Sequence, residues 1–294
     1  MNKIVVWGLK SVIDSYKFIQ KSFYENAKLL GYEAVWVDDL ETNQSLVNRG
    51  DIVFAVDRAR KHLPIRSDAK YVLHNISSEE LQLEKNFINI QVFRKDSIGA
   101  SLGIHWVQWD ESSRTLFQPW GIPIPPRLWK IPSYPIKRQE YWIGSIWNDS
   151  ENRGNSEFMK KYIQELTKQE ILFYRKGTPT RLQPNGISEK RGQKLVNRSV
   201  IGAAVVGEWQ RENLYVPCRL FKNIAAGAPP SSNSDFSLVF GEVGGIFEPD
   251  PELLIAKVLS LSKKQREEIV LSSQAKMIPY TYNAGMNRIF NFLV

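Results

Sequence analysis

The sequence contains few residues that bind metal ions or form covalent crosslinks. Its 294 residues include a single cysteine, Cys218, and three histidines. One cysteine excludes an intrachain disulfide and any metal site built from several cysteines. Three histidines scattered along the chain provide no ligand cluster. We therefore expect no bound metal ion and no other cofactor.

Several motifs that bind phosphates are also absent. The chain has no Walker-type glycine-rich loop and no Gly-x-Gly-x-x-Gly after its first strand-like run. These absences argue against kinase-like and dinucleotide-binding proteins. The chain also lacks an Asp-x-Asp sequence, which argues against the metal-dependent class of glycosyltransferases.

Long hydrophobic runs are missing as well. No stretch approaches the roughly 18–20 apolar residues that span a membrane. The first residues, Met1–Lys10, lack the apolar core of a signal peptide. We therefore expect a cytoplasmic protein without a transmembrane segment.

Basic residues exceed acidic ones. The 39 lysines and arginines against 31 aspartates and glutamates give a formal net charge of +8. Such an excess favours anionic partners. The basic residues are scattered rather than clustered, whereas nucleic-acid-binding surfaces are usually clustered. A phosphate-bearing small molecule is therefore the preferred partner, and we expect no nucleic acid.

The first part of the chain alternates between strand-like and helix-like segments. Gly31 ends an apolar pattern of helical spacing over Tyr16–Leu30. Short apolar runs on both sides of this helix indicate buried parallel strands. The predicted strands are Ile4–Trp7, Ala34–Val37, Asp51–Val56, Lys70–Leu73 and Ile88–Phe93. A strand–helix–strand start of this kind is typical of doubly wound sheets.

A proline-rich region follows and separates two α/β halves. Residues 99–135 contain six prolines and little periodicity, which indicates the end of the first domain and an extended linker. A second alternation then predicts strands at Tyr141–Ile146, Ile171–Tyr174 and Val200–Val206. Its predicted helices are Glu151–Leu166, Ser188–Leu195, Val216–Ala226, Glu252–Leu261, Lys263–Lys276 and Asn283–Phe292. We expect domains at 1–125 and 126–280, with a C-terminal helix in 281–294 that can return to the first domain.

The segment Gly207–Phe240 is the most informative part of the sequence. An apolar strand ends at Gly207, and Pro217 opens a helix. A helix that starts at the carboxyl end of parallel strands offers free N–H groups and a positive dipole end to an anion. Arg219 and Lys222 lie one turn apart on this helix and can add charge. The alternative is an ordinary strand–helix unit whose cations are solvated.

The string VPCRLFKNIAAGAPPSSN within this segment resembles the donor-site helix of glycosyltransferases of the GT-B class, most of all the spore-protein-like and exostosin-like groups. The resemblance covers about 35 residues closely and the C-terminal half loosely. It implies an α/β fold of two Rossmann-like domains that face each other across a cleft. It also implies that Arg219 lies near the donor diphosphate, and that Tyr215 and Val216 lie near the base or ribose.

One residue departs from the family pattern. Related enzymes often carry Glu where this chain has Lys222, and that carboxylate accepts both ribose hydroxyls. Lysine cannot accept a hydrogen bond. Asn223, Glu208 or Glu242 can replace the missing acceptor, and the sequence does not choose among them.

Two further loops are candidates for contact with the donor. The loop Gly144–Asn155 follows a strand, and in GT-B enzymes the matching loop often touches the diphosphate; here Gly144, Ser145 and Arg153 are the candidates. Its alternative role is a plain helix start capped by Ser150 or Asn152. Arg175 lies just past the end of another strand, where a solvated loop is the alternative.

The first half offers two candidates for a catalytic base. Asp14 lies in the loop after the first strand, and His74 follows the strand Lys70–Leu73. Either can deprotonate an acceptor hydroxyl. Asp14 can instead cap the following helix, and an interior histidine is often a structural hydrogen-bonder. His105 lies among tryptophans that can stack on sugar rings or pack the linker.

These observations lead to one main hypothesis and two others. We expect a metal-independent glycosyltransferase, hexosyl- or pentosyl-, that takes a UDP- or GDP-sugar and a glycan or small-molecule acceptor. The departure at Lys222 supports an alternative, a non-catalytic two-lobed protein that binds a nucleotide or sugar. A nucleic-acid-binding protein rests on net charge alone.

Overall fold

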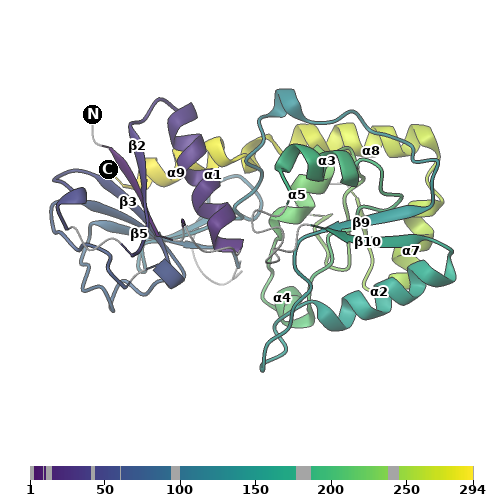
Figure 1. Cartoon of the computed structure of the whole chain (residues 1–294), viewed down its shortest axis with the longest axis horizontal. Coiled ribbons are helices and arrows are strands. Elements are labelled where there is room, and N and C mark those ends of the chain that lie inside the picture. Colours follow the sequence, from purple (N-terminus) through teal and green to yellow (C-terminus); the bar gives the residue numbers. More distant parts are fainter. Residues whose placement is uncertain are drawn as a thin grey trace. The chain divides into compact units, whose positions relative to one another are not determined.

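The computed structural model describes residues 3–8, 10, 15–40, 44–59, 61–93, 100–176, 187–237 and 245–293. The chain divides into two compact units: Met1–Pro123 with Thr281–Val294, and Ile124–Tyr280. Both units combine helices with mainly parallel strands (Figure 1). The chain is therefore a mixed α/β protein, as predicted.

The first unit is built on an eight-stranded sheet with the order β2-β1-β3-β4-β5-β8-β7-β6. The six strands from β2 to β8 pair in parallel, and β7 and β6 extend the sheet in antiparallel fashion. The bounds are β1 Ile4–Trp7, β2 Ala34–Val37, β3 Ile52–Val56, β4 Lys70–His74, β5 Phe87–Gln91, β6 Ala100–Ser101, β7 Gln108–Asp110 and β8 Thr115–Phe117. The central strand β1 is fully buried, and β3 and β4 are buried after their first residue, because these strands carry apolar residues on both faces.

Two helices from opposite ends of the chain pack on each other in this unit. They are α1 (Ser15–Leu29) and α9 (Tyr282–Phe292). Phe23 of α1 stacks on Phe54 of β3, with 4.1 Å between ring centroids, and meets Phe290 of α9 edge-on. Thr281 caps α9 by accepting a hydrogen bond from Ala284 N–H. The C-terminal helix therefore belongs to the core of the first unit.

The proline-rich region is more ordered than the sequence predicted. Its first part forms β6, β7 and β8 and completes the sheet. Trp109 of β7 stacks on Phe292 of α9 at 4.2 Å, so this tryptophan packs the first unit. After β8 the chain has no further strand until β9 (Gln139–Ile143), and Pro126–Leu128 form a 3-10 turn on the way. Short strands of two or three residues carry too little periodicity to be found from sequence.

The second unit has two layers of helices around short parallel strands. In Figure 1, β9 and β10 lie between α3, α5 and α8 on one side and α2 and α7 on the other. The strands are β9 Gln139–Ile143, β10 Leu172–Lys176, β11 Ser231–Ser232 and β12 Ile246–Phe247. The helices are α2 Ser156–Lys168, α3 Glu189–Val196, α4 Glu208–Glu212, α5 Cys218–Ala225, α7 Pro251–Leu259 and α8 Lys263–Lys276.

The buried segment Val200–Val206 lies between these strand pairs, yet it does not pair as a regular strand. Side chains replace most of the ladder. The Glu140 carboxylate accepts from Ile201 and Gly202 N–H, and Asn233 Oδ1 accepts from Val206 N–H. Asn223 Nδ2 donates to Gly202 O, Ser232 Oγ to Ala204 O, and Asn233 Nδ2 to Val206 O. The apolar run predicted the position of this segment, but not the substitution of side chains for backbone partners.

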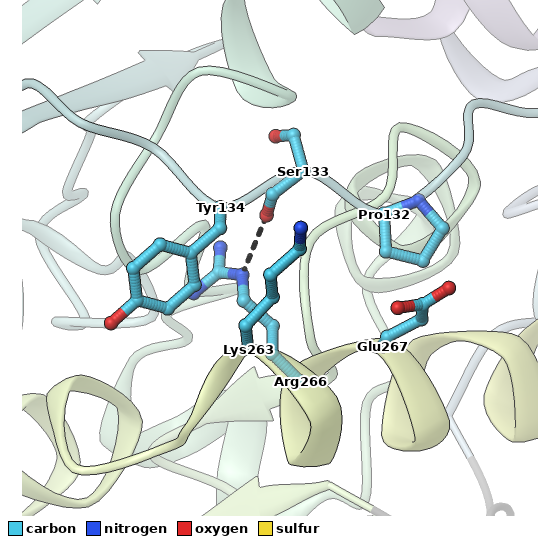
Figure 2. A pocket seen from close by; sticks show the side chains of 6 residues that line it. All are labelled: Pro132, Ser133, Tyr134, Lys263, Arg266 and Glu267. Carbon is cyan, nitrogen blue, oxygen red and sulfur yellow. Dashed lines mark hydrogen bonds between the residues drawn. The ribbon is translucent and has the colours of Figure 1, made fainter.

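A buried arginine holds this segment from its other end. Arg266 of α8 is 4% exposed and donates to the carbonyls of Ser133, Val200 and Ser199 at 3.1, 2.8 and 3.2 Å. Figure 2 shows its bond to Ser133 O beside a notch of about 20 Å³, large enough for about one water molecule. Burial raises the pKa of Glu140 to about 7, and Arg266 acts to lower it. Arg266 and Glu140 thus form a buried network around residues 199–202.

Candidate functional site

The predicted donor helix places a cation at the carboxyl end of β9. Arg219 is in the first turn of α5, and its Nε donates to Ile143 O at 3.1 Å. Its guanidinium lies 3.6 Å from the ring centroid of Trp142, in cation–π contact. Arg219, Trp142 and the turn after β9 therefore form one cluster, which we call the Arg219 site.

Arg219 has no carboxylate partner in the described part of the chain. Its interactions there are the bond to Ile143 O and the contact with Trp142. Burial lowers the pKa of Arg219 to about 10, so the side chain stays protonated at neutral pH. A half-buried cation without a counter-charge is costly. An anion bound here would remove that cost.

Gly144 allows the guanidinium to approach the backbone. Its φ of +130° disfavours any other residue, and a Cβ at this position would overlap Nη2 of Arg219. Gly144 N–H also donates to Lys176 O at 3.2 Å, which ties the end of β9 to β10. Ser145 follows as an exposed residue. The structure thus brings Gly144, Ser145 and Arg219 together.

Lys222 forms an ion pair one turn further along α5. Its Nζ lies 2.8 Å from Oε1 of Glu189, the first residue of α3. Burial acts to lower the pKa of Lys222, but the Glu189 carboxylate outweighs it and the pKa lies above the usual value. The Glu189 carboxylate therefore lies beside Lys222 of α5. The sequence signal for Glu189 was weak, because the residue is distant in sequence from α5.

The loops after β9 and after residues 200–206 touch each other through glycines. A Cβ on Gly207 would overlap the carbonyl oxygen of Gly154, and a Cβ on Gly154 would overlap Trp147 O. The loop 147–155 is also closed by side chains: Asn148 Oδ1 accepts from Gly154 N–H, and Asn155 Oδ1 from Trp147 N–H. Neither Ser150 nor Asn152 caps α2, which starts after Asn155.

Two of the predicted cations differ in their partners. Arg153 binds Asp149 at 2.7 Å and Glu151 at 3.3 Å, so its charge is already balanced within its own loop. Arg175 is exposed in β10, in register with Trp142, and contacts no partner in the described residues. Arg175 is therefore the better second cation for an anion at this edge.

The remaining predicted donor residues have structural partners. Glu208 is exposed and pairs with Arg211 at 3.0 Å. Asn223 is 5% exposed and donates to Gly202 O at 2.6 Å, which favours a structural role. Val216 is buried at 2% and Tyr215 is half-buried. Asp14 and Glu242 lie outside the described residues.

The geometry around His74 favours the structural alternative over a catalytic base. The side chain is 2% exposed at the end of β4. Its Nδ1 lies 3.1 Å from Ile90 O, and its Nε2 lies 3.4 Å from Nε1 of Trp120. The neutral tautomer with a proton on Nδ1 satisfies both contacts, because the indole N–H donates to Nε2. This leaves no lone pair of His74 for an acceptor hydroxyl.

The buried position of His74 predicts a pH effect on stability. Burial lowers its pKa to about 4, against an unfolded value near 6.5. Because the folded pKa is lower than the unfolded one, neutral His74 contributes its full share to the free energy of unfolding above pH 6.5, and this share is lost as the pH falls toward 4. In His74→Asn, the acid-induced fall in the free energy of unfolding should therefore be smaller by roughly 3 kcal/mol. Urea denaturation at a series of pH values measures it.

The exposed His105 provides the matched control, since His105→Asn should keep the pH dependence of the wild type. An unchanged pH dependence in His74→Asn would contradict the structural role.

A separate pocket of about 420 Å³ lies where β11 and β12 end. It is lined by Arg211, Asn233, Asp235, Ser237, Gly245, Phe247, Glu248 and Pro249. None of these residues was among the predicted donor contacts. Two of its charged residues form ion pairs, Arg211 with Glu208 and Glu248 with Lys257, and Asp235 accepts a hydrogen bond from Ser237 N–H.

Within the described residues, no group of three or more metal-ligating side chains is close enough to hold an ion. No described helix is both long and apolar enough to cross a membrane.

Comparisons with known proteins identify no family. No family model matches the chain, and no curated protein matches its sequence. Among solved structures, the chain is similar to the Candida albicans trehalose-6-phosphate phosphatase N-terminal domain. The TM-score is 0.49 and the identity 9%, over 100% of this chain and 97% of that chain. A likeness at this level does not identify an activity.

Proposed function

We propose that the protein is a metal-independent glycosyltransferase with the GT-B architecture of two Rossmann-like domains. It would transfer a sugar from a nucleoside-diphosphate donor to a hydroxyl of its acceptor. The observation that carries the proposal is Arg219, a half-buried cation without a carboxylate partner in the described chain, at the start of α5. The sequence resemblance implies a diphosphate at this position.

The Arg219 site has the chemistry that a diphosphate requires. A guanidinium has planar donors that match phosphate oxygens. Arg219 uses its Nε–H to bind Ile143 O, so its other N–H groups can bind phosphate oxygens. The free N–H groups in the first turn of α5 add the positive end of the helix dipole. During transfer the leaving diphosphate gains negative charge, so a fixed cation there stabilises the transition state more than the ground state.

Glu189 is a candidate for the carboxylate that related enzymes carry at the position of Lys222 and that this chain lacks there. A ribose offers two neighbouring hydroxyls, and only an acceptor such as a carboxylate can receive both hydrogen bonds. The Lys222 ammonium holds the Glu189 carboxylate at 2.8 Å. We propose that this pair replaces the usual glutamate, with Glu189 as the ribose acceptor and Lys222 as its positioning residue.

A panel of nucleoside diphosphates and nucleotide sugars tests the function by thermal shift. A ligand at 100 times its dissociation constant stabilises the folded protein by about 2.7 kcal/mol, which is a clear rise in melting temperature. UDP or GDP should raise it without added metal ion, and EDTA should leave the rise unchanged. If no nucleoside diphosphate shifts the melting temperature, the proposal fails.

The Glu189 role makes a prediction of its own. In Glu189→Gln the carboxylate is lost but the side-chain size is kept, so affinity for the ribonucleotide should fall about tenfold. Affinity for the matching 2′-deoxynucleotide should fall less, because its sugar keeps only one of the two hydroxyls that Glu189 would accept from. Isothermal titration of the wild type and of Glu189→Gln, each with the ribonucleotide and with the 2′-deoxynucleotide, measures these affinities. Equal losses for both nucleotides would assign Glu189 a merely structural role.

A non-catalytic nucleotide-binding protein is the second candidate. The observation in its favour is that His74 is enclosed and hydrogen-bonded at both nitrogens. Release of free nucleoside diphosphate from a nucleotide sugar over time separates the two candidates. A protein that binds the donor without turnover would support the second.

A further inference from the structure

The connection that enters β9 has an unusual composition. Residues 126–138 contain four cations, Arg127, Lys130, Lys137 and Arg138, and no acidic residue. They also contain Leu128, Trp129, Ile131, Tyr134 and Ile136. After the 3-10 turn Pro126–Leu128, the chain has no regular secondary structure until β9. Cations and large apolar residues therefore share one irregular segment.

The spacing of the prolines indicates a left-handed extended helix with three residues per turn. Pro132 and Pro135 have a fixed φ, and the residues before them are restricted to extended conformations. Trp129 already has φ −66° and ψ 150°, which are values of the polyproline II helix. In such a helix every third residue shares a face. Ile131 and Tyr134 therefore point the same way, and Leu128, the last residue of the 3-10 turn, precedes Ile131 by three residues.

The exposure of the side chains follows this period of three. Leu128, Ile131 and Tyr134 are 55%, 81% and 53% exposed, whereas the residues between them are half-buried. Ile136, next to Lys137, is 98% exposed. Two isoleucines with this much exposure, five residues apart, differ from scattered surface leucines. We call these four side chains the apolar ridge.

The backbone beneath the ridge is held firmly. Lys130 N–H donates to Ala225 O at 2.7 Å, and its carbonyl accepts from Gln274 at 3.0 Å. Ile131 O accepts from Asn197 at 3.2 Å, and Ser133 bonds both Asn197 and Arg266. Figure 1 shows the connection running past α3 and α8 before it enters β9. The ridge therefore projects from an anchored backbone.

We propose that the apolar ridge and its cations bind the surface of a membrane that contains anionic lipids. Apolar tips insert among the acyl chains near the headgroups, while lysine and arginine pair with lipid phosphates. Arg127 and Lys137 are exposed and Lys130 is half-buried, and none of the three forms an ion pair in the described chain, so their charges are available. This surface is independent of the proposed donor site.

The geometry favours a membrane over a protein that reads proline-rich peptides. Such a reader must contact the prolines themselves. Pro132 and Pro135 lie on the half-buried faces, and Figure 2 shows Pro132 beside α8. The acidic Glu267 of α8 lines the same notch, but Lys263 of the same helix is there too. The ridge has cations at both ends, Arg127 before it and Lys137 and Arg138 after it, which suits an anionic surface.

Sedimentation with lipid vesicles tests the proposal on the full chain. Vesicles of phosphatidylcholine with roughly 30% phosphatidylglycerol should bring down the wild type, and pure phosphatidylcholine vesicles should not. The double variant Ile131→Ser with Ile136→Ser should weaken binding by about tenfold or more. The double variant Arg127→Gln with Lys137→Gln should weaken it by about tenfold and reduce its salt dependence.

Matched control variants remove exposed apolar or basic side chains at positions outside the apolar ridge. Leu253→Ser in α7 loses a side chain that is 51% exposed, and Lys160→Gln with Lys161→Gln loses two exposed cations of α2. Both should bind vesicles as the wild type does. The proposal is overturned if the wild type ignores anionic vesicles, or if the ridge variants bind as well as the controls. Circular dichroism checks that each variant is folded.

Discussion

Replacing Arg219 by alanine is expected to lower the affinity for a nucleoside diphosphate by about 100-fold, which corresponds to about 2.7 kcal/mol. The guanidinium has no carboxylate to neutralise it in the described chain, so the bound diphosphate would be its counter-charge. Removing the guanidinium takes away a charge-assisted hydrogen bond and leaves the bound phosphate oxygens without a partner, which lowers the affinity. Isothermal titration with UDP and GDP measures the change.

The same variant separates a binding role from a structural one. A half-buried cation without a counter-charge costs the folded state free energy, so Arg219→Ala should keep or raise the melting temperature without ligand. Arg49→Ala, at an exposed position of the first unit, should change neither quantity. A fall in melting temperature with unchanged nucleotide affinity would show that Arg219 only supports the fold.

Gly144→Ala approaches the same site from the backbone. The added methyl group would overlap Nη2 of Arg219, and the alanine would have to adopt a φ of +130°. The guanidinium should be displaced, and nucleotide affinity should fall although every charged group is retained.

Replacing Arg266 by leucine is expected to lower the free energy of unfolding by about 3–5 kcal/mol. The variant removes three hydrogen bonds to backbone carbonyls inside the second unit. It also removes the nearby positive charge that lowers the pKa of Glu140. Each carbonyl left without a donor costs free energy because water does not reach it. Urea denaturation at neutral pH measures the loss.

Coupling to Glu140 provides the control for this prediction. In Glu140→Gln the side chain is neutral, so Arg266→Leu in that background should cost less than in the wild type. Arg191→Leu, at an exposed position of α3, should stay within about 0.5 kcal/mol of the wild type. Additive effects of the two substitutions would contradict the network.

Sequence patterns predicted those parts of the fold that have strong periodicity. The strands β1 and β2 were predicted with their observed bounds, because each is a run of four apolar residues bounded by charged residues or glycine. The helix α8 was also predicted with its observed bounds, and Ser262 with Gln265 forms its capping box. The strands β6 to β8 escaped prediction because each has only two or three residues.

The sequence predicted candidate residues that have a local signal, but not contacts between residues that are distant in the sequence. Arg219 and Gly144 were predicted as neighbours of the donor because a helix start and a strand end each have a local signature, and the structure places these two residues side by side. Glu189 was not among the predicted residues, since its contact with Lys222 joins residues 33 positions apart. The pairing of Arg153 with Asp149 was missed for a different reason: the sequence shows both charges but not their geometry.

The side-chain bonds around residues 200–206 have a consequence for how the two units tolerate mutation. In the first unit, parallel pairing joins backbone to backbone, so no single substitution except proline removes a pair. In the second unit, Glu140, Asn233 and Arg266 each hold one part of the central segment. Their loss would unpair backbone groups directly, and amide hydrogen exchange would rise at Ile201, Gly202 or Val206 while β1 to β5 stayed protected. Drift in sequence should therefore be slower at these three polar positions than at the apolar ones around them.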